Sequence, residues 1–342
     1  MTAASRARKY QPRSLPEGKQ ATSAMIASLE AEGYDTVPAP FGHALARLAG
    51  TDPRIVGLTA DLSKYTDLHI FAQAHPDRFY QMGMAEQLLM AAAAGLAHEG
   101  FVPFATTYAA FASRRACDFI SQTIAEEALP VKICAALPGL TSGYGPSHQA
   151  TEDIAILRGI PELTIIDPCD ATDVAQMVPA MAAHGGPVYA RLLRGQVAGV
   201  LTRHKPDYRF EIGRAQMIRE GRDVLVVSSG IMTMRALDAA TDLAADGIDV
   251  AVLHCPTIKP LDTATIMAEA GRGRLLVVAE NHTETGGLGE AVAAALLEAG
   301  VTPVFRRIAL PDAFLEAGAL PALHDMYGIS RRAVVDRIRG WL

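Results

Sequence analysis

The sequence has few of the features that mark metal-binding, membrane-spanning or disulfide-rich proteins. Its four cysteines lie far apart and form no CxxC pair, so we expect structural thiols in a reduced, cytoplasmic protein. The ten histidines show no HExxH or other paired spacing, and no metal site is expected from them. The most apolar run, Leu88 to Ala97, suits a buried helix and is too short to span a bilayer. The basic N-terminus precedes no apolar stretch, so it is not a secretory signal.

An excess of positive charge is also lacking. The chain has 31 basic and 37 acidic residues, for a formal net charge of -6. This balance argues against nucleic acid as a partner, because phosphate backbones require clustered Lys and Arg. Small phosphorylated substrates need only one or two basic residues and stay possible. The 342 residues, half of them hydrophobic, suffice for about two domains with a large core.

Strand-like and helix-like segments alternate along the first two thirds of the chain, which predicts an α/β fold with mostly parallel sheets. The segments that read as strands are Arg54–Leu58, Val131–Ala135, Leu163–Ile166 and Pro187–Leu192. Those that read as helices are Pro40–Leu48 and Ala85–Ala97.

A polar segment, Thr202 to Arg209, interrupts this pattern and is a candidate interdomain linker. Beyond it the alternation restarts, with expected strands at Asp223–Ser228, Ile248–Leu253, Leu275–Ala279 and Val304–Ile308 and expected helices at Thr233–Ala245 and Leu288–Ala299. We therefore predict an N-terminal arm over residues 1–35, an α/β domain over 36–200, a linker over 201–212 and a smaller α/β domain over 213–342.

Glu86 is the most informative single residue. It lies in Gly83-Met84-Ala85-Glu86-Gln87, just before the alanine-rich apolar run, and so is expected at a helix N-terminus. The helix dipole stabilises a charge there, whereas burial destabilises it. From spacing alone, a capping glutamate on a surface helix would explain the residue better than a functional carboxylate.

The order of several segments narrows the choice. PDRFYQMGMAEQ, AAAAGLAHEGFVPFATTYAAFASRRACDFI and GPSHQATEDIAILRGIPELTIIDPCD follow one another along the chain. In that order they resemble the transketolase family, over roughly residues 41–342 and most strongly over 61–194. The chain looks most like split transketolases, whose halves are separate polypeptides. The resemblance implies a pyrimidine-binding domain of the thiamine diphosphate type followed by a smaller transketolase C-terminal domain.

This resemblance implies a thiamine diphosphate site. In the family, the glutamate at the position of Glu86 hydrogen-bonds the cofactor's aminopyrimidine and promotes the tautomer that creates the carbanion nucleophile. Tyr108 and Phe111 match aromatics that pack on that ring, and their spacing of three would place them on one helical face. Asp61 matches an aspartate near the cofactor, although an Asx turn after a strand would explain it as well.

Two further residues match the family's substrate site. His148, in the loop Gly143-Tyr144-Gly145-Pro146-Ser147-His148-Gln149, is implied to hydrogen-bond substrate hydroxyls. Arg194 matches an arginine that binds the substrate's phosphate. Its planar guanidinium can donate two hydrogen bonds to one oxyanion. Tyr144 stands where the family usually has an aspartate, and Arg114 where it often has another aromatic. These departures affect the expected sugar specificity and the aromatic cage.

The sequence has no GDG triplet. In thiamine enzymes that triplet belongs to the signature that holds the diphosphate through Mg²⁺, and full transketolases are about twice this length. The resemblance therefore implies a partner polypeptide, the N-terminal transketolase subunit, which would supply those contacts. We expect this chain to pair with a second copy of itself as well, giving an α2β2 complex with a large interface. The expected substrates are small sugars.

Four alternatives stay open. The chain could be the β-subunit of a 2-oxoacid dehydrogenase or the C-terminal part of a deoxyxylulose phosphate synthase, which share the glutamate and the fold. It could also be a non-catalytic partner descended from such an enzyme. A nicotinamide-dependent oxidoreductase rests only on the α/β pattern, since Gly286-Gly287-Leu288-Gly289 lacks the full GxGxxG fingerprint.

Overall fold

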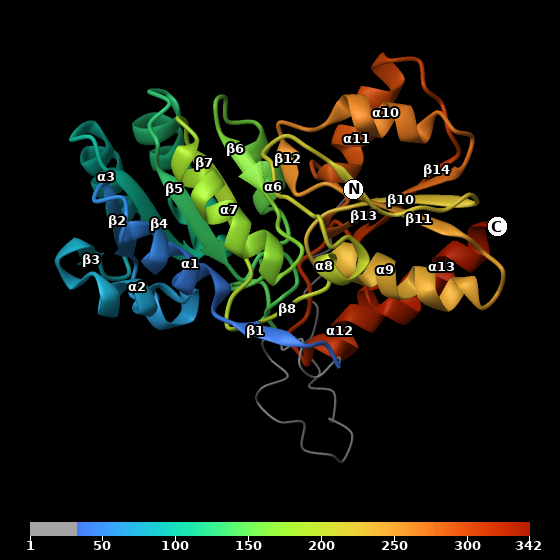
Figure 1. Cartoon of the computed structure of the whole chain (residues 1–342), viewed down its shortest axis with the longest axis horizontal. Helices are drawn as coiled ribbons and strands as arrows, with labels where there is room; N and C mark the ends of the chain where they lie inside the picture. The colour runs from blue at the N-terminus through green and yellow to red at the C-terminus, as the bar shows by residue number, and fades with distance from the viewer. Residues whose placement is uncertain (1–32) are drawn as a thin grey trace, which may run out of the picture.

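Residues 33–342 are described by a computed structural model, in which two α/β units lie side by side (Figure 1). The predicted N-terminal arm over 1–35 falls almost wholly outside the described residues. The first element among the described residues, β1 (Thr36–Pro38), pairs antiparallel with β8 (Gln196–Ala198). Within residues 33–342 no helix is long and apolar enough to cross a membrane.

The larger sheet lies in the first unit and is parallel except at one edge. Its strands, in sheet order, are β12 (Thr257–Lys259), β6 (Thr164–Ile166), β7 (Val188–Leu192), β5 (Lys132–Ala136), β4 (Val102–Tyr108), β2 (Ile55–Thr59) and β3 (Phe79–Gln81). The central strands are buried along their whole length. Such continuous apolar runs are typical of parallel strands covered by helices on both faces.

Helices connect these strands and cover the sheet. They are α1 (Pro40–Ala49), α2 (Leu68–Ala74), α3 (Glu86–His98), α4 (Ala109–Arg115), α5 (Cys117–Phe119) with a π-helical turn over Ile120–Ala125, α6 (Asp153–Arg158) and α7 (Ala171–Ala183). Short 3₁₀ turns lie at Ser63–Thr66 and Pro76–Arg78. Each expected strand and helix of this region is present, and no end is shifted by more than one residue.

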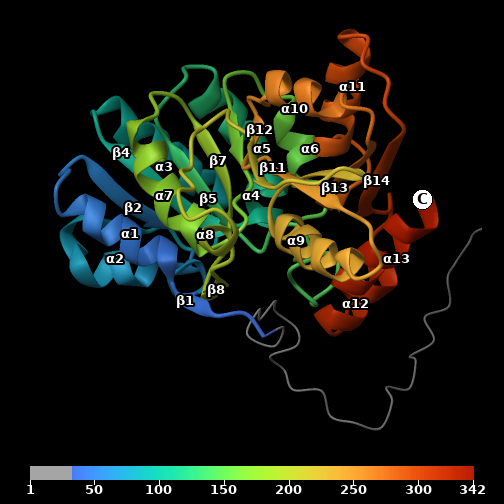
Figure 2. The same cartoon turned by 45° about the vertical axis from the view of Figure 1, so that its right-hand side comes forward.

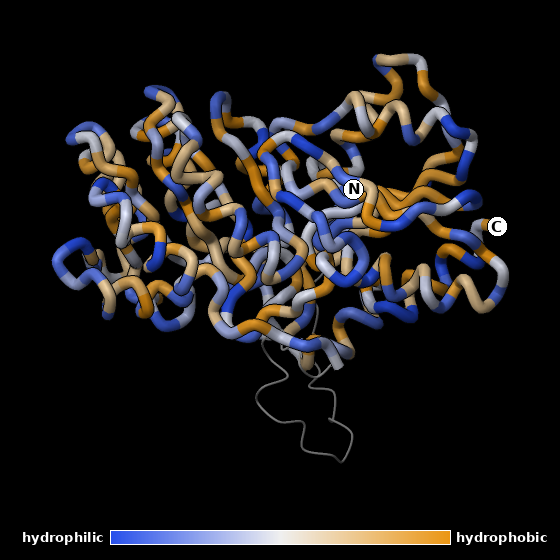
Figure 3. The backbone as a smooth tube through the Cα atoms, in the orientation of Figure 1, coloured by the Kyte–Doolittle hydropathy of each residue, from blue (hydrophilic) through white to orange (hydrophobic). Residues whose placement is uncertain are grey.

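The smaller sheet forms the second unit and runs in the order β14 (Phe305–Leu310), β13 (Leu275–Thr283), β10 (Val224–Ser228), β11 (Val250–His254) and β9 (Gln216–Arg219). Its helices are α9 (Ile231–Ala244), α10 (Thr263–Ala270), α11 (Leu288–Glu298), α12 (Leu320–Tyr327) and α13 (Arg331–Trp341). Figure 2 shows them on both sides of the sheet, and Figure 3 shows the hydrophobic strands between them.

The boundary between the units is more closely packed than a polar linker would suggest. The expected linker contains a short helix, α8 (Leu201–His204), and Tyr208, which is fully buried and donates a hydrogen bond of 2.5 Å to Asp173. Strand β12 follows this boundary in the sequence but pairs with β6 of the larger sheet. The chain therefore returns to the first unit after starting the second.

A buried ion network joins the two units around Arg191 of β7. Its guanidinium donates to both carboxylate oxygens of Asp153, at 3.0 and 3.1 Å, and to Asp167 at 3.1 Å. It also donates to the backbone carbonyl of Asn281 in β13, at 2.9 Å. The hydroxyl of Ser229, beside β10, donates to Asp167 at 2.7 Å. Because every charge is paired, this cluster holds strands of both sheets in one geometry.

Replacing Arg191 tests this network. Arg191→Met keeps the volume of the side chain but leaves Asp153 and Asp167 buried without a cation. We expect the free energy of unfolding to fall by about 3–5 kcal/mol, as for a broken buried pair. Urea denaturation followed by circular dichroism measures it. The control Arg54→Met removes an exposed arginine paired with Asp52 and should leave the midpoint nearly unchanged; equal shifts in the two variants would contradict this account.

Candidate active site

Glu86 is the first residue of α3, as the sequence predicts, and is 2% exposed. The turn before it places the carboxylate where the free N–H groups and the dipole of the helix stabilise a negative charge. Its hydrogen-bond donor in the described chain is Arg115, whose Nη1 lies 3.3 and 3.4 Å from the two carboxylate oxygens. Glu86 is thus a buried carboxylate whose hydrogen bonds to Arg115 are long, and it is not a surface cap.

Phe111 lies in α4 beside this ion pair. The Arg115 guanidinium carbon is 3.9 Å from the centre of the Phe111 ring, a cation–π contact. Tyr108 is the last residue of β4 and precedes α4, so the expectation that Tyr108 and Phe111 share a helical face was wrong. Their ring centroids are nevertheless 5.6 Å apart, because the strand ends directly at the helix.

His148 completes the aromatic group from a separate loop. Its ring centroid lies 5.3 Å from that of Phe111, 6.2 Å from Tyr108 and 5.6 Å from Tyr144. Burial, and next the Arg115 charge, lower the pKa of His148 below its ordinary value. The lowered pKa favours the neutral imidazole, a form that can both donate and accept a hydrogen bond.

Arg114 holds the loop that carries His148. The sequence did not predict this role, because it showed only that Arg114 stands where the family often has an aromatic residue. Its guanidinium donates to the carbonyls of Pro146 and Gln149, at 2.7 and 2.9 Å, and to the Glu152 carboxylate at 2.5 Å. These bonds span both sides of His148 in the chain. The adjacent pair Arg114-Arg115 was the available signal, since two arginines at the end of a mostly buried helix need partners.

Arg194 lies just beyond β7 and is half-buried. One of its terminal nitrogens, Nη2, is buried and has no hydrogen-bond partner within residues 33–342. Asp67 lies close enough for its charge to interact with Arg194, and it accepts a hydrogen bond of 2.8 Å from Gly195. Burial raises the pKa of Asp67, although the Gly195 bond and the Arg194 charge oppose that shift. An unsatisfied guanidinium donor beside this carboxylate suits a polar or anionic ligand group.

Asp61 follows β2, whose end pairs with the end of β4 close to Tyr108. It is exposed and has a left-handed backbone with φ of 58°. Its N–H donates to Gln81 Oε1 at 2.7 Å, and the same oxygen accepts from the N–H of Gly83 at 3.1 Å. Gln81 therefore ties Asp61 to the turn that leads into Glu86.

The residues present fit a flat, hydrogen-bonding heterocycle better than a metal ion. The half-exposed side chain of Arg115 contacts both a buried carboxylate, Glu86, and an aromatic ring, Phe111. An aminopyrimidine ring can use both the carboxylate and the ring face. Among residues 33–342 no group of three or more His, Cys, Asp and Glu side chains could hold a metal ion.

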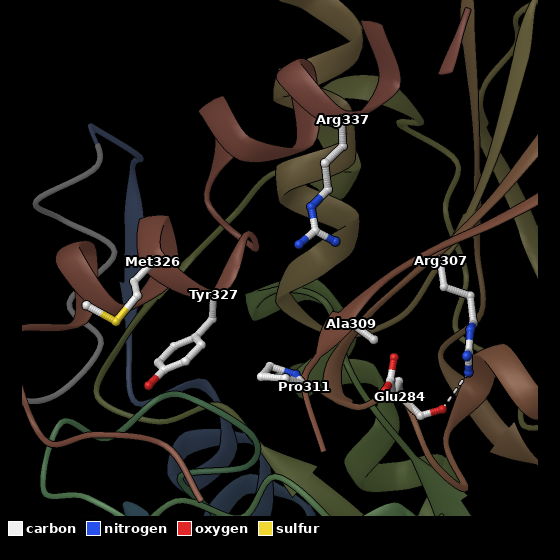
Figure 4. Close-up of a pocket in the computed structure, with 7 residues that line it drawn as sticks. All are labelled: Glu284, Arg307, Ala309, Pro311, Met326, Tyr327 and Arg337. Carbon is white, nitrogen blue, oxygen red and sulfur yellow. Dashed lines mark hydrogen bonds between the residues drawn. The ribbon is translucent and has the colours of Figure 1, made fainter. Parts of the chain in front are cut away.

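A hollow of about 320 Å³ lies elsewhere, in the second unit, between β14 and the helices α12 and α13 (Figure 4). Its lining residues are Glu284, Arg307, Ala309, Pro311, Met326, Tyr327 and Arg337. None of them belongs to the group around Glu86. The hydroxyl of Tyr327 accepts a hydrogen bond of 3.1 Å from Glu316, whose carbonyl accepts one of 3.0 Å from Gln149 in the His148 loop.

The environment of His148 generates a prediction about its titration. Both burial and the charge of Arg115 disfavour the imidazolium, so the pKa should lie below the ordinary value of about 6.5. Arg115→Ala removes one of these causes and should raise the pKa. An NMR titration of the imidazole, assigned with His148→Gln, measures both values. Arg54→Ala is the control for loss of a distant charge, and an equal shift in that variant would refute the local explanation.

Both units of the chain match known domain families. Residues 36–199 match the pyrimidine binding domain of transketolase, and residues 213–334 match the transketolase C-terminal domain. A split-gene transketolase solved as an inactive beta4 tetramer superposes with a TM-score of 0.80 and 42% identity, over 88% of this chain and 96% of that one. The transketolase from Leishmania mexicana, at 22% identity and a TM-score of 0.70, covers 92% of this chain and 47% of its own length, and shows the fold alone.

Two sequence relatives extend the comparison. A transketolase family protein from Sinorhizobium fredii is 68% identical over 323 residues, which is 94% of this chain and 93% of that protein. A 6-deoxy-6-sulfo-D-fructose transketolase subunit from Clostridium sp. is 38% identical over 85% of this chain and 89% of that subunit. With both halves of the fold matched and identity this high over nearly the whole length, the chain belongs to the transketolase family.

Proposed function

We propose that this chain is the C-terminal subunit of a thiamine diphosphate-dependent transketolase, which moves a two-carbon ketol unit from a ketose to an aldose. One observation carries the proposal: the Glu86 carboxylate, buried at a helix N-terminus, shares Arg115 as a partner with the Phe111 ring, and His148 packs against that ring. The proposal assigns residues 36–200 to the pyrimidine-binding domain and 213–342 to the C-terminal domain. Thiamine diphosphate, when bound, supplies a carbon nucleophile that the protein side chains lack.

The residues of this chain then have separate tasks. Glu86 would accept the hydrogen bond of an aminopyrimidine ring and favour its reactive tautomer. Phe111 and Tyr108 would pack on the ring. His148, held in its loop by Arg114, would hydrogen-bond the hydroxyls of the sugar near the reacting carbons, and in its neutral form it can act as donor or acceptor.

Arg194 would bind the far end of the sugar. Its Nη2 group has no hydrogen-bond partner, so it would donate to an oxyanion of the substrate, such as a phosphate or another terminal anion. The relative from Clostridium sp. is named for a sulfonated sugar, so a sulfonate belongs among the substrates to be assayed. Asp61, linked through Gln81 to the turn before Glu86, would lie at the rim of the cofactor site.

A partner chain follows from the same proposal. The cofactor's diphosphate and Mg²⁺ would be held mainly by an N-terminal subunit, in an α2β2 complex. Exposed apolar side chains surround the start of α3: Met84 is 82% exposed and Leu88 is 54% exposed. Apolar residues that flank a buried functional carboxylate support a subunit interface at this position.

Deoxyxylulose phosphate synthesis is the second candidate, because synthases for 1-deoxy-D-xylulose-5-phosphate are also relatives. One from Synechococcus sp. is 36% identical over 87% of this chain, which spans 46% of that enzyme. Reconstituted complex should be assayed with a ketose phosphate and an aldose, and separately with pyruvate and an aldose phosphate. Release of CO₂ from pyruvate without ketol transfer would favour the second candidate.

Glu86→Gln tests the central assignment. The amide keeps the size and reach of the side chain but cannot carry its negative charge. We expect the variant to fold and assemble normally, and to lose about 10²-fold or more in turnover at saturating thiamine diphosphate and Mg²⁺. Glu99→Gln, at the exposed end of the same helix, is the matched control and should keep its turnover. Near wild-type turnover of Glu86→Gln would show that Glu86 is not the activating carboxylate.

Arg194→Ala tests the substrate end. Loss of the guanidinium should raise KM for a phosphorylated ketose and leave kcat and the KM for a non-phosphorylated ketose less affected, because the arginine would contribute binding rather than chemistry. Arg194→Lys keeps the charge without the fork and should give an intermediate KM. Steady-state kinetics of the complex measure both KM values. An equal rise in KM for the two ketoses would show that Arg194 does not recognise the anionic group.

A further inference from the structure

Arg115 already makes the two contacts that the proposed function assigns to an aminopyrimidine. Its Nη1 lies 3.3 and 3.4 Å from the oxygens of Glu86, and its planar guanidinium lies 3.9 Å from the centre of the Phe111 ring. A guanidinium is flat, donates hydrogen bonds in its own plane and stacks on aromatic faces. In these three respects a guanidinium resembles a protonated aminopyrimidine.

Few contacts hold the side chain of Arg115 in place. It is the last residue of α4, and its side chain is 48% exposed. Within the described part of the chain, Glu86 and Phe111 are its contacting partners, and both distances to Glu86 are at the long end for a hydrogen bond. Its neighbour Arg114 differs, because three bonds of 2.5 to 2.9 Å fix it to the His148 loop.

Glu86 explains why such a side chain is useful. A carboxylate that is buried without a cation or a hydrogen-bond donor destabilises the fold. Arg115 compensates that charge until another donor takes its place. The same contact reduces the apparent affinity of that donor, because only the fraction of molecules with Arg115 turned away can bind it.

We propose that Arg115 holds the place of the aminopyrimidine before thiamine diphosphate binds, and that it turns toward solvent when the cofactor enters. This inference rests on the proposed function. It makes Arg115 a residue that regulates cofactor loading, not a catalytic one. Cofactor binding exchanges one partner of Glu86 and Phe111 for another, so neither the buried carboxylate nor the ring face is left without a contact.

The first test measures cofactor affinity instead of activity. Thiamine diphosphate is titrated with Mg²⁺ into the complex of this chain with the N-terminal subunit, and Kd is obtained by calorimetry. We expect Arg115→Ala to bind about 5-fold more tightly than wild type. Arg115→Lys keeps the charge but lacks the flat face, and should lie between them. Arg54→Ala, which removes a distant exposed arginine, should bind like wild type.

Two outcomes separate this inference from the proposed function. If wild type and Arg115→Ala bind thiamine diphosphate equally well, or the variant binds it less tightly, Arg115 does not compete with the cofactor and the inference is overturned while the function stands. If wild type and all variants fail to bind thiamine diphosphate, the proposed function is overturned, and the inference with it.

A second test uses thermal unfolding. Without cofactor, Arg115→Ala should lower the midpoint of the complex, because Glu86 loses its partner; in the Glu86→Gln background the same change should have little effect. With saturating thiamine diphosphate, the difference between Arg115→Ala and wild type should disappear. An equal loss with and without cofactor would make Arg115 an ordinary structural residue and would refute the exchange.

Discussion

The buried guanidinium of Arg191 is the interaction on which the arrangement of this protein depends. It lies at the end of a strand in the larger sheet, yet its partners come from three other places: the start of α6, the end of β6 and strand β13 of the smaller sheet. A buried arginine is tolerated only when carboxylates and carbonyls satisfy it completely. The four hydrogen bonds that it donates therefore require both sheets to be present and correctly oriented, which links the folding of the two units.

The same link determines where His148 lies. The loop before α6 runs between the units and is fixed to the second one: the N–H of Leu140 donates to Asn281 at 2.9 Å, and the N–H of Gly318 donates to Gly143 at 2.9 Å. Gln149 donates to Glu316 at 3.0 Å. The smaller unit contributes none of the proposed catalytic side chains, but it holds the loop that presents His148 to Phe111. Its function here is to position that loop.

Buried charge also organises the site around Glu86. Helix α3 brings a carboxylate into an apolar environment, and the end of α4 supplies the arginine that compensates it. Arg114 and Arg115 are adjacent in sequence but differ in their partners, one fixed to the protein by three bonds and the other half-exposed over a ring. Arg114 is therefore a rigid support for the loop that carries His148, whereas Arg115 can turn away from Glu86 and Phe111.

Much of the fold was predictable from the sequence. Apolar runs bounded by turns predicted the central strands of both sheets, and the alanine-rich run after Glu86 predicted α3, because continuous burial and helix start signals are local properties. The order of the motifs also identified the family and the candidate residues.

Contacts between distant segments could not be obtained in this way. The strand ending at Tyr108, the return of β12 to the first sheet, the Arg114 contacts with the His148 loop and the pairing of Arg115 with Glu86 each join residues whose spacing carries no periodic signal. The sequence by itself determined which elements form and which side chains can do chemistry. Only the tertiary structure decided which of those side chains meet, because buried charges choose their partners from whatever the packing of two sheets brings within a few ångströms.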